Sequence, residues 1–174
     1  MKNEKIILVG KSGSGKDFLL RGLVKIGLRY QPKITTRPIR KSEKQGVEYI
    51  FESNEMFQEL LKSNQIKTHQ HFLINDCNWF YAITNENFNN NQLFIMTPHE
   101  ISCLSEDERK QCFVVYLDIC EEVRRKRINR RNDNNDSVNR RIEADNQDFL
   151  GFSDYDLRIT DPDFEVSMIY DLMY

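Results

Sequence analysis

The run Gly10–Lys16 (GKSGSGK) constrains the fold of this chain more than any other feature of its sequence. An apolar run of strand length, Ile6–Val9, precedes it, and a segment of helical periodicity from Lys16 to about Ile26 follows it. A glycine-rich turn between a buried strand and a helix is the setting of a phosphate-binding loop, or P-loop. Glycine allows backbone conformations that aim N–H groups at phosphate oxygens, while the lysine and the helix N-terminus add positive charge. The alternative is a turn without a ligand, but the strand, the spacing and the lysine together favour phosphate binding.

The composition excludes several classes of protein. The chain has 174 residues, of which 39% are hydrophobic, enough for one domain with a buried core. Its net charge of −2 provides no overall positive field that would attract nucleic acid or a membrane, so any anion site must be local. The four cysteines form no Cys-x-x-Cys pair, and no apolar run approaches the roughly 20 residues of a membrane span. We therefore expect reduced thiols, a cytoplasmic location and no membrane contact.

Strand-length apolar runs alternate with segments of helical period, which predicts an α/β fold. The expected strands are residues 6–9, 34–36, 93–96, 112–117 and 157–160, and the expected helices are residues 16–26, 121–131, 136–149 and 164 to the C-terminus. Thr97–Glu100 has the pattern of a capping box with proline at the first helical position. This order predicts a P-loop NTPase core in which helices flank a parallel five-stranded sheet.

The stretch from about 35 to 91 differs from this pattern. Short alternating runs surround one helix at Glu55–Lys62, which predicts a small mixed or antiparallel subdomain. The polar segment Asn132–Asp136 joins two arginine-bearing helices and predicts a helical lid over about 127–141. We expect a single domain, with its core at about 1–34 and 92–174 and the subdomain inserted between them.

The residue after the loop lysine is unusual. Serine or threonine normally occupies this position and binds Mg²⁺ through its hydroxyl, but here it is Asp17. A carboxylate can bind Mg²⁺ directly, and in the first turn of a helix it can also cap backbone N–H groups. Both interpretations, a metal ligand and a helix cap, remain open.

A second candidate anion site lies in the run ITTRPIRKSEKQGVEYIFESNEMF, which starts at Ile34. The guanidinium groups of Arg37 and Arg40 can bind a monophosphate as a fork, and Tyr49 can donate a hydrogen bond to it. The alternative for two arginines in a loop is surface salt bridging.

This run resembles guanylate kinases, a family of P-loop nucleoside monophosphate kinases, of which the chain looks like a divergent member. The family pattern recurs here as Thr35, Thr36, Arg37, Arg40, Glu43, Gly46, Glu48, Tyr49, Phe51, Ser53 and Phe57. With the phosphate loop, the 127–141 region and the closing SDYDLRITDPDF, the resemblance covers most of the chain. It implies ATP binding by Gly10, Lys11, Ser12, Gly13, Ser14, Gly15, Lys16, Asp17, Arg127 and Arg131. It implies binding of the acceptor's phosphate by Arg37, Arg40, Glu43, Tyr49, Tyr81 and Arg141.

Arginines are dense between Arg124 and Arg131 and recur at Arg140 and Arg141. They could contact nucleic acid, but acidic residues interleave with them and no aromatic stacking platform accompanies them. In guanylate kinases the matching segment is a lid that closes over ATP, and phosphoryl transfer needs cations around the transferred group. The resemblance therefore implies no nucleic acid partner and a catalytic set of Lys16, Arg37, Arg131 and Arg141.

Three base-reading positions depart from the family pattern. Guanylate kinases have a serine, a glutamate and a hydroxyl there, whereas this chain has Lys33, Thr68 and Ile83. A glutamate accepts both N–H groups of the guanine edge, which a threonine cannot do. The acidic strand end of the family is also absent near Met96, and we hypothesise that Asp17 replaces it in holding Mg²⁺ with ATP.

His69, His71 and Cys77 raise one more alternative, because alternate residues of a strand face one side and such side chains can bind zinc. A fourth ligand is not evident. We place the two histidines beside the acceptor pocket instead, where an imidazole can hydrogen-bond a base.

The sequence thus predicts an ATP-dependent nucleoside monophosphate kinase, a phosphotransferase that uses Mg²⁺. GMP or dGMP is the first expectation for the acceptor. Two alternatives remain: a non-catalytic, guanylate kinase-like module that binds protein partners, and a kinase of a different or modified nucleotide. We expect a monomer or a homodimer.

Overall fold

The chain forms two compact units, each with its own sheet. The computed structural model describes residues 4–41, 43–74, 76–130 and 137–173. The first unit contains Met1–Leu28 and Leu93–Tyr174, and the second contains Arg29–Gln92. The stretch expected as an insertion, about 35–91, falls inside the second unit. The two ends of that unit are hydrogen-bonded to each other: the Gln92 N–H donates to the Arg29 carbonyl at 3.0 Å, and the Arg29 N–H donates to the Gln92 side-chain oxygen at 3.3 Å.

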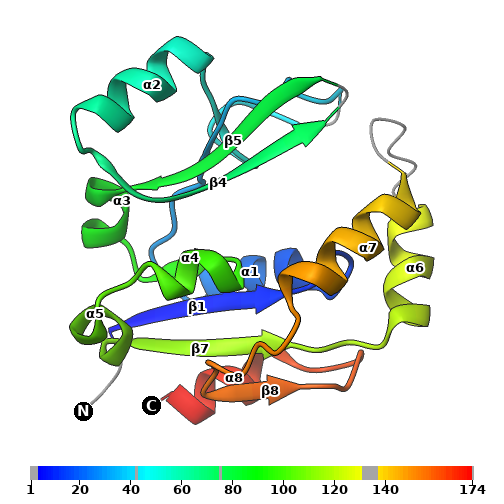
Figure 1. The fold of residues 1–174 in the computed structure, drawn as a ribbon. Helices are drawn as coiled ribbons and strands as arrows, with labels where there is room; N and C mark the ends of the chain where they lie inside the picture. Colours follow the sequence, from blue (N-terminus) through cyan, green and yellow to red (C-terminus); the bar gives the residue numbers. More distant parts are fainter. Residues whose placement is uncertain (1–3, 42, 75, 131–136, 174) are drawn as a thin grey trace. The chain divides into compact units, whose positions relative to one another are not determined.

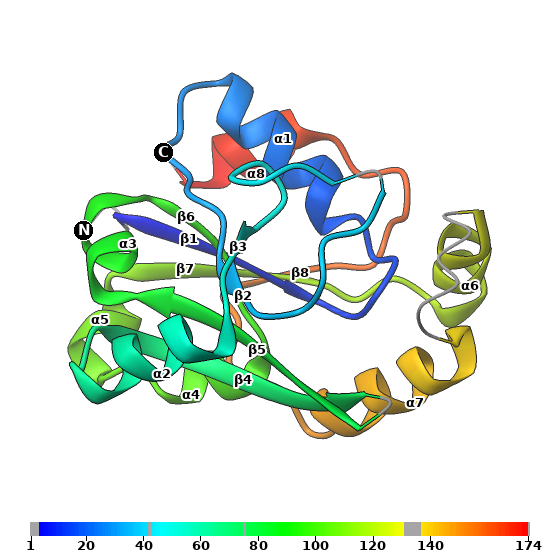
Figure 2. The same cartoon turned by 90° about the horizontal axis from the view of Figure 1, so that it is seen from above.

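The first unit is built around a parallel sheet (Figure 1). Its strands, in spatial order, are β6 (Leu93–Ile95), β1 (Lys5–Gly10), β7 (Cys112–Leu117) and β8 (Leu157–Ile159). Its helices are α1 (Lys16–Lys25), α4 (Pro98–Ser102), α5 (Glu106–Lys110), α6 (Glu121–Arg130), α7 (Val138–Asp148) and α8 (Val166–Met173). Helices α1 and α8 lie on one face of the sheet, and α4, α5 and α7 lie on the other (Figures 1 and 2).

The sheet positions the candidate site. Every residue of β1 is buried, as expected for a parallel strand covered on both faces. Gly10 at the end of β1 pairs in register with Leu117 at the end of β7. The phosphate loop and the segment leading to α6 therefore leave the same edge of the sheet, at the carboxyl ends of parallel strands, where α/β folds bind their ligands.

The predicted mixed α/β architecture with flanking helices is confirmed, but the strand count is not. We expected residues 34–36 as a fifth strand of the parallel sheet. In the structure β2 (Ile34–Thr35) belongs to the sheet of the second unit, where it pairs with two other strands of that unit. The parallel sheet thus has four strands among the described residues.

The second unit contains a mixed sheet in the order β3-β2-β5-β4. Its remaining elements are β3 (Ile50–Phe51), α2 (Asn54–Lys62), β4 (Ile66–Ile74), β5 (Cys77–Thr84) and α3 (Asn85–Asn90). Strand β2 is parallel to β3 and antiparallel to β5, and β4 and β5 form a long antiparallel pair. The fully buried Phe57 of α2 stacks on Phe80 of β5, with 4.3 Å between ring centroids, and so holds the helix on the sheet.

Most predicted helices form at the expected places, and their ends follow local rules. The capping box at Thr97 and Glu100 is confirmed: each side chain accepts a hydrogen bond from the other residue's backbone N–H. Helix α3 was not expected, since asparagine is a weak helix former; its N-cap Thr84, which accepts from the Asn87 N–H, supplies the start signal. Within the described part of the chain, no helix combines the length and the apolar character needed to cross a bilayer.

Candidate active site

The phosphate loop has the backbone shape that its glycines predict. Gly13 and Gly15 have φ values of 77° and 106°, in the left-handed region that favours glycine. A Cβ atom at Gly13 would also lie 2.7 Å from the carbonyl oxygen of Arg124 in α6. Both the backbone conformation and the lack of space therefore require glycine at this position. The Lys16 Nζ donates to the carbonyl oxygens of Gly10 and Lys11, which places its charge over the loop.

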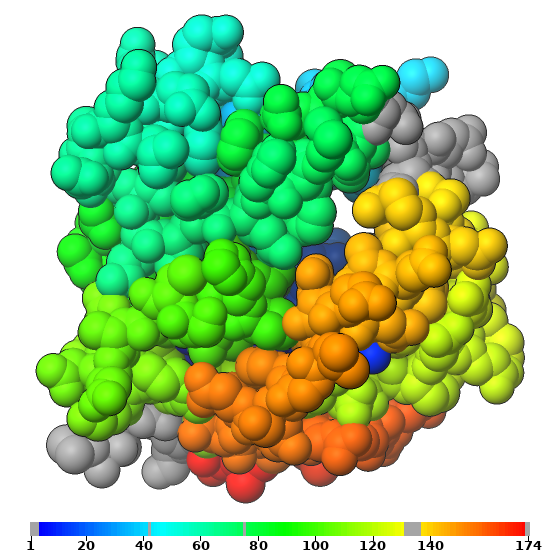
Figure 3. All heavy atoms as spheres, viewed as in Figure 1, coloured from blue at the N-terminus to red at the C-terminus, as the bar shows by residue number. Residues whose placement is uncertain are grey.

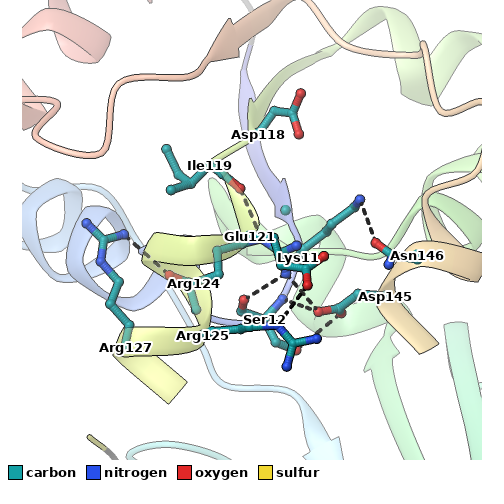
Figure 4. Close-up of polar contacts among 12 residues, drawn as sticks. Lys11, Ser12, Asp118, Ile119, Glu121, Arg124, Arg125, Arg127, Asp145 and Asn146 are labelled. Atoms are coloured by element: carbon teal, nitrogen blue, oxygen red, sulfur yellow. Dashed lines mark hydrogen bonds and ion pairs between the residues drawn. The ribbon is translucent and has the colours of Figure 1, made fainter. Parts of the chain in front are cut away.

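Side chains from α6 and α7 surround this loop (Figure 4). Arg127 of α6 donates from Nη1 to the carbonyl oxygens of Gly13 and Ser14, at 3.3 and 3.2 Å. Its Nη2 donates to the Pro162 carbonyl at 2.8 Å. Ser12 is contacted by Asp145 of α7. Of the predicted ATP-binding residues, Arg127 is therefore beside the loop, whereas Arg131 lies outside the described residues.

A cavity of about 370 Å³ opens beside the loop. It is lined by Gly13, Gly15, Asp17, Phe18, Arg21, Arg127, Arg130, Pro162 and Phe164. Phe18 and Phe164 meet edge to face there, with ring centroids 5.9 Å apart. Cationic groups and aromatic surface next to a phosphate loop are suited to a nucleotide, because one end of that ligand is anionic and the other is an aromatic base.

Asp17 occupies the first turn of α1 and lines this cavity. The described residues contain no group of three or more His, Cys, Asp or Glu side chains that could hold a metal ion by themselves. Mg²⁺ in kinases is bound by one or two carboxylates together with substrate phosphates and water, not by an all-protein cage. One carboxylate beside a phosphate loop therefore fits Mg²⁺ that arrives with a nucleotide.

The second unit brings five of the six predicted monophosphate residues into one cluster, whereas the sixth, Arg141, lies on α7 of the first unit. Arg37 is only 3% exposed, and its Nη1 and Nη2 donate to the two carboxylate oxygens of Glu43. Its guanidinium carbon lies 5.1 Å from the centroid of the Tyr49 ring, which in turn meets the Tyr81 ring edge to face at 5.6 Å. Glu43 also accepts from the Arg40 backbone N–H at 2.9 Å. The cluster thus presents two guanidinium groups and two phenols, and Glu43 holds its loop in shape.

Charge and burial shift the pKa values of this cluster. Burial acts to lower the pKa of Arg37, but the hydrogen bond and charge of Glu43, with Tyr81 and Tyr49, outweigh it and raise that pKa. Burial acts to raise the pKa of Glu43, but the hydrogen bonds from Arg37 and Arg40 hold it below its ordinary value. Burial raises the pKa of the Tyr81 phenol, although Arg37 and Arg40 oppose the shift. At neutral pH the Tyr81 phenol therefore keeps its proton and can donate a hydrogen bond, and Arg37 is charged.

The lowered pKa of Glu43 predicts a pH dependence of stability. A carboxyl group with a lower pKa in the folded state stabilises the protein above its unfolded pKa, about 4.3, and this contribution is lost as the pH falls through the folded value. We expect wild type to be more stable than Glu43→Gln at pH 7 and the difference to shrink below about pH 4. Thermal unfolding of both proteins between pH 7 and pH 3 measures it. A difference that stays constant over this range would contradict the assignment.

The family model of guanylate kinase matches residues 2–170 of the chain. The chain belongs to the guanylate kinase family. It is 27% identical to the guanylate kinase of a Nostoc species over 97% of this chain and 87% of that protein, and 29% identical to that of Rickettsia bellii over 91% and 86%. Its fold is similar to the crystal structure of guanylate kinase from Anaplasma phagocytophilum, with a TM-score of 0.70 and 20% identity over 99% of this chain and 85% of that one.

The three positions that we expected at the acceptor base lie together in the second unit. Thr68 of β4 and Ile83 of β5 are cross-strand partners, and Lys33 directly precedes β2. Thr68 and Ile83 are buried, at 3% and 1% exposure. The Thr68 hydroxyl has no hydrogen-bond partner among the described residues. A buried hydroxyl without a partner is uncommon, so this position calls for an explanation.

The histidine prediction is wrong. Phe57 of α2 contacts the His69 ring, and the His71 ring stacks on Phe80. Phe80 and Tyr81 are consecutive in β5 and point to opposite faces of the sheet. The two histidines therefore cover the face under α2, away from the Tyr81 cluster.

Sequence analysis did not assign a role to several residues that are far from the loop in the chain but lie beside it in the structure. These residues contact or line the site: Arg124, Asp145 and the turn Pro162–Phe164. One signal was available for Arg124: it precedes the buried Ile128 by four residues and so lies on the buried face of α6. Arg141, predicted to bind the acceptor phosphate and to act in catalysis, is on α7 and half-buried.

Proposed function

We propose that this chain transfers the γ-phosphoryl group of ATP to a nucleoside monophosphate, with GMP or dGMP as acceptor. The observation that supports this most is the Arg37, Arg40, Tyr49 and Tyr81 cluster. It is an anion site on a different unit from the phosphate loop, and a protein that only binds ATP has no physical need of it. Membership of the guanylate kinase family supports the same reaction.

The proposed reaction is a direct in-line transfer. An oxygen of the acceptor phosphate attacks the γ-phosphorus, and the bond from that phosphorus to the bridging oxygen of ADP breaks. The acceptor phosphate is already ionised at neutral pH, so no general base is required. Arg37 and Arg40 would hold the acceptor, while Lys16 with Arg131 and Arg141 would stabilise the charge on the transferred group.

Mg²⁺ is part of the proposal, because ATP generally acts with a divalent metal. Asp17 would contact it from the first turn of α1, and the ATP phosphates would supply further oxygens. When bound, Mg²⁺ neutralises charge on the phosphates. Asp118, which follows β7, is already paired with Arg158 and is the less suitable carboxylate.

The non-catalytic alternative is not favoured. A module that binds only protein partners gains nothing from Lys16 over a complete phosphate loop, nor from Arg127 beside it. A kinase of another nucleotide differs from our proposal only in the acceptor base. A cytoplasmic location and a monomeric or homodimeric state also remain part of the proposal.

One assay tests the reaction. The protein is incubated with ATP, Mg²⁺ and each common ribo- and deoxyribonucleoside monophosphate in turn, and the diphosphate products are measured. We expect diphosphate from GMP or dGMP. No diphosphate from any acceptor, with ATP binding intact by calorimetry, would refute the proposal and favour the protein-binding module.

The Thr68 hydroxyl gives a test of base recognition. Thr68→Val removes a buried hydroxyl that has no partner, so we expect stability to be unchanged or raised by about 1–3 kcal/mol. If the hydroxyl meets the acceptor base, the acceptor KM rises about tenfold, the value of one hydrogen bond. Urea unfolding and steady-state kinetics measure the two effects.

Thr36→Val is the matched control. The Thr36 hydroxyl accepts from the Phe80 N–H at 3.0 Å, so its loss should cost about 1 kcal/mol. An unchanged acceptor KM in Thr68→Val would remove this residue from base recognition and leave the rest of the site in place.

A further inference from the structure

Two consecutive residues of α7 hold two consecutive residues of the phosphate loop (Figure 4). The Ser12 backbone N–H donates to Asp145 Oδ2 at 2.8 Å, and the Ser12 hydroxyl donates to Asp145 Oδ1 at 3.2 Å. The Lys11 Nζ donates to Asn146 Oδ1 at 3.1 Å. The carboxylate of Asp145 thus bonds both the backbone and the side chain of one loop residue, a contact specific in geometry as well as charge.

Arg124 of α6 balances the charge of this carboxylate. Its side chain is 3% exposed, and its Nη1 lies 3.5 Å from Asp145 Oδ2 and 3.4 Å from the Ser12 carbonyl oxygen. Its Nε donates to the Ile119 carbonyl at 3.0 Å. Because a guanidinium stands beside it, Asp145 can touch a loop built for polyphosphate without adding net negative charge there.

The contact lies in the last turn of α7, and the residue that follows this helix is held by a second contact. Phe149, the C-cap of α7, stacks on Tyr116 of β7 with 5.6 Å between ring centroids, and Phe152 and Tyr155 complete that aromatic cluster. Figure 3 shows α7, in yellow to orange, lying beside α6. Arg141 is one turn before Asp145, on the same side of the helix. Of the two attachments, Asp145 is therefore the nearer to Arg141.

We propose that Asp145 is a positioning residue for phosphoryl transfer: it ties α7 to the phosphate loop and thereby sets where Arg141 stands. The inference rests on the proposed function, because it assigns Arg141 to the transferred group. Asp145 touches no substrate in this scheme. Asp145 affects the reaction indirectly, because it holds the phosphate loop and α7 in position.

Steady-state kinetics test this assignment. We expect Asp145→Ala to lower kcat about tenfold or more while KM for ATP changes less than about threefold, since a cation that acts in the transition state affects kcat. Asp145→Asn retains an oxygen for the Ser12 N–H and should stay within about threefold of wild-type kcat. Glu143→Ala, an exposed carboxylate on the same helix, should leave both constants unchanged.

A double-mutant cycle separates positioning from a merely structural role. In an Arg141→Ala background, Asp145→Ala should reduce kcat by less than about twofold further, because both changes remove the same contribution. An equal loss in the two backgrounds overturns the proposal, as does an Asp145→Asn variant as impaired as Asp145→Ala.

Amide hydrogen exchange tests the attachment without any acceptor. Asp145→Ala should speed exchange in the described residues 137–148 about tenfold or more relative to wild type, while α1 is unaffected. Unchanged exchange overturns the attachment even if the enzyme is active. If wild type transfers phosphate to no acceptor, the proposed function fails, and the exchange result still decides whether Asp145 holds α7.

Discussion

Replacing Lys16 with methionine lowers kcat for phosphoryl transfer by about 10²- to 10³-fold, the usual cost of removing one preorganised charge or donor from a transition state. Lys16 Nζ already lies over the loop, bonded to the carbonyl oxygens of Gly10 and Lys11. In the proposed complex the phosphate oxygens of ATP replace these neutral partners, so the charge is in place before the reaction begins. Methionine keeps the length of the side chain and removes the charge. Steady-state kinetics at saturating ATP and acceptor measure the change.

Lys25→Met is the control for this variant. Lys25 is exposed in the last turn of the same helix, so the same substitution there should leave kcat unchanged. KM for the acceptor should stay within about twofold of wild type in both variants, since the cluster that we propose for the acceptor phosphate lies in the second unit. A Lys16→Met enzyme with kcat within about threefold of wild type would exclude this lysine from the transition state.

Replacing Arg37 with alanine destabilises the protein by about 3–5 kcal/mol and also abolishes tight acceptor binding. Arg37 and Glu43 form a pair whose side chains are 3% and 9% exposed, so truncation leaves a nearly buried carboxylate without its partner. The guanidinium also covers the Tyr49 and Phe51 rings. Urea unfolding measures the stability, and KM for GMP measures the acceptor site.

A double variant separates the two effects of Arg37. Arg37→Met with Glu43→Gln replaces the ion pair by neutral groups and retains an acceptor for the Arg40 N–H, so most of the stability should return. Acceptor binding should not return, because no guanidinium is restored. Arg40→Ala, at a side chain 28% exposed, should raise the acceptor KM with less than about 1 kcal/mol lost in stability. Recovery of acceptor binding in the double variant would show that Arg37 acts only through the fold.

Local signals made much of the first unit predictable. A buried apolar run before a glycine-rich turn and a periodic helix after it identified β1, the loop and α1, because strand burial, φ preference and helix periodicity are properties of short segments. The Thr97 capping box was predictable for the same reason. The cluster of Arg37, Arg40, Tyr49 and Tyr81 could be predicted only from a pattern of residue types that extends over a longer segment of the sequence.

The pairing of strands in a sheet and the contacts between distant residues could not be predicted from such local signals. Ile34 and Thr35 have the composition of a buried strand, but nothing in them specifies which sheet they join; pairing with Ala82 and Tyr81 decides that. The bond between Asp145 and Ser12 joins residues 133 positions apart, and a buried ion pair leaves no periodic trace in the sequence. The spacing of Arg124 from Ile128 indicates a buried position on α6, but only the assembled unit shows that Asp145 is its partner.

The hydrogen bonds between Arg29 and Gln92 hold the two ends of the second unit together. The chain therefore leaves the unit that contains the phosphate loop and returns to it at neighbouring points. A related segment with similarly paired ends could be grafted in its place by changing one contiguous stretch of sequence. Acceptor preference would then travel with the graft, whereas the machinery for the donor would stay as it is.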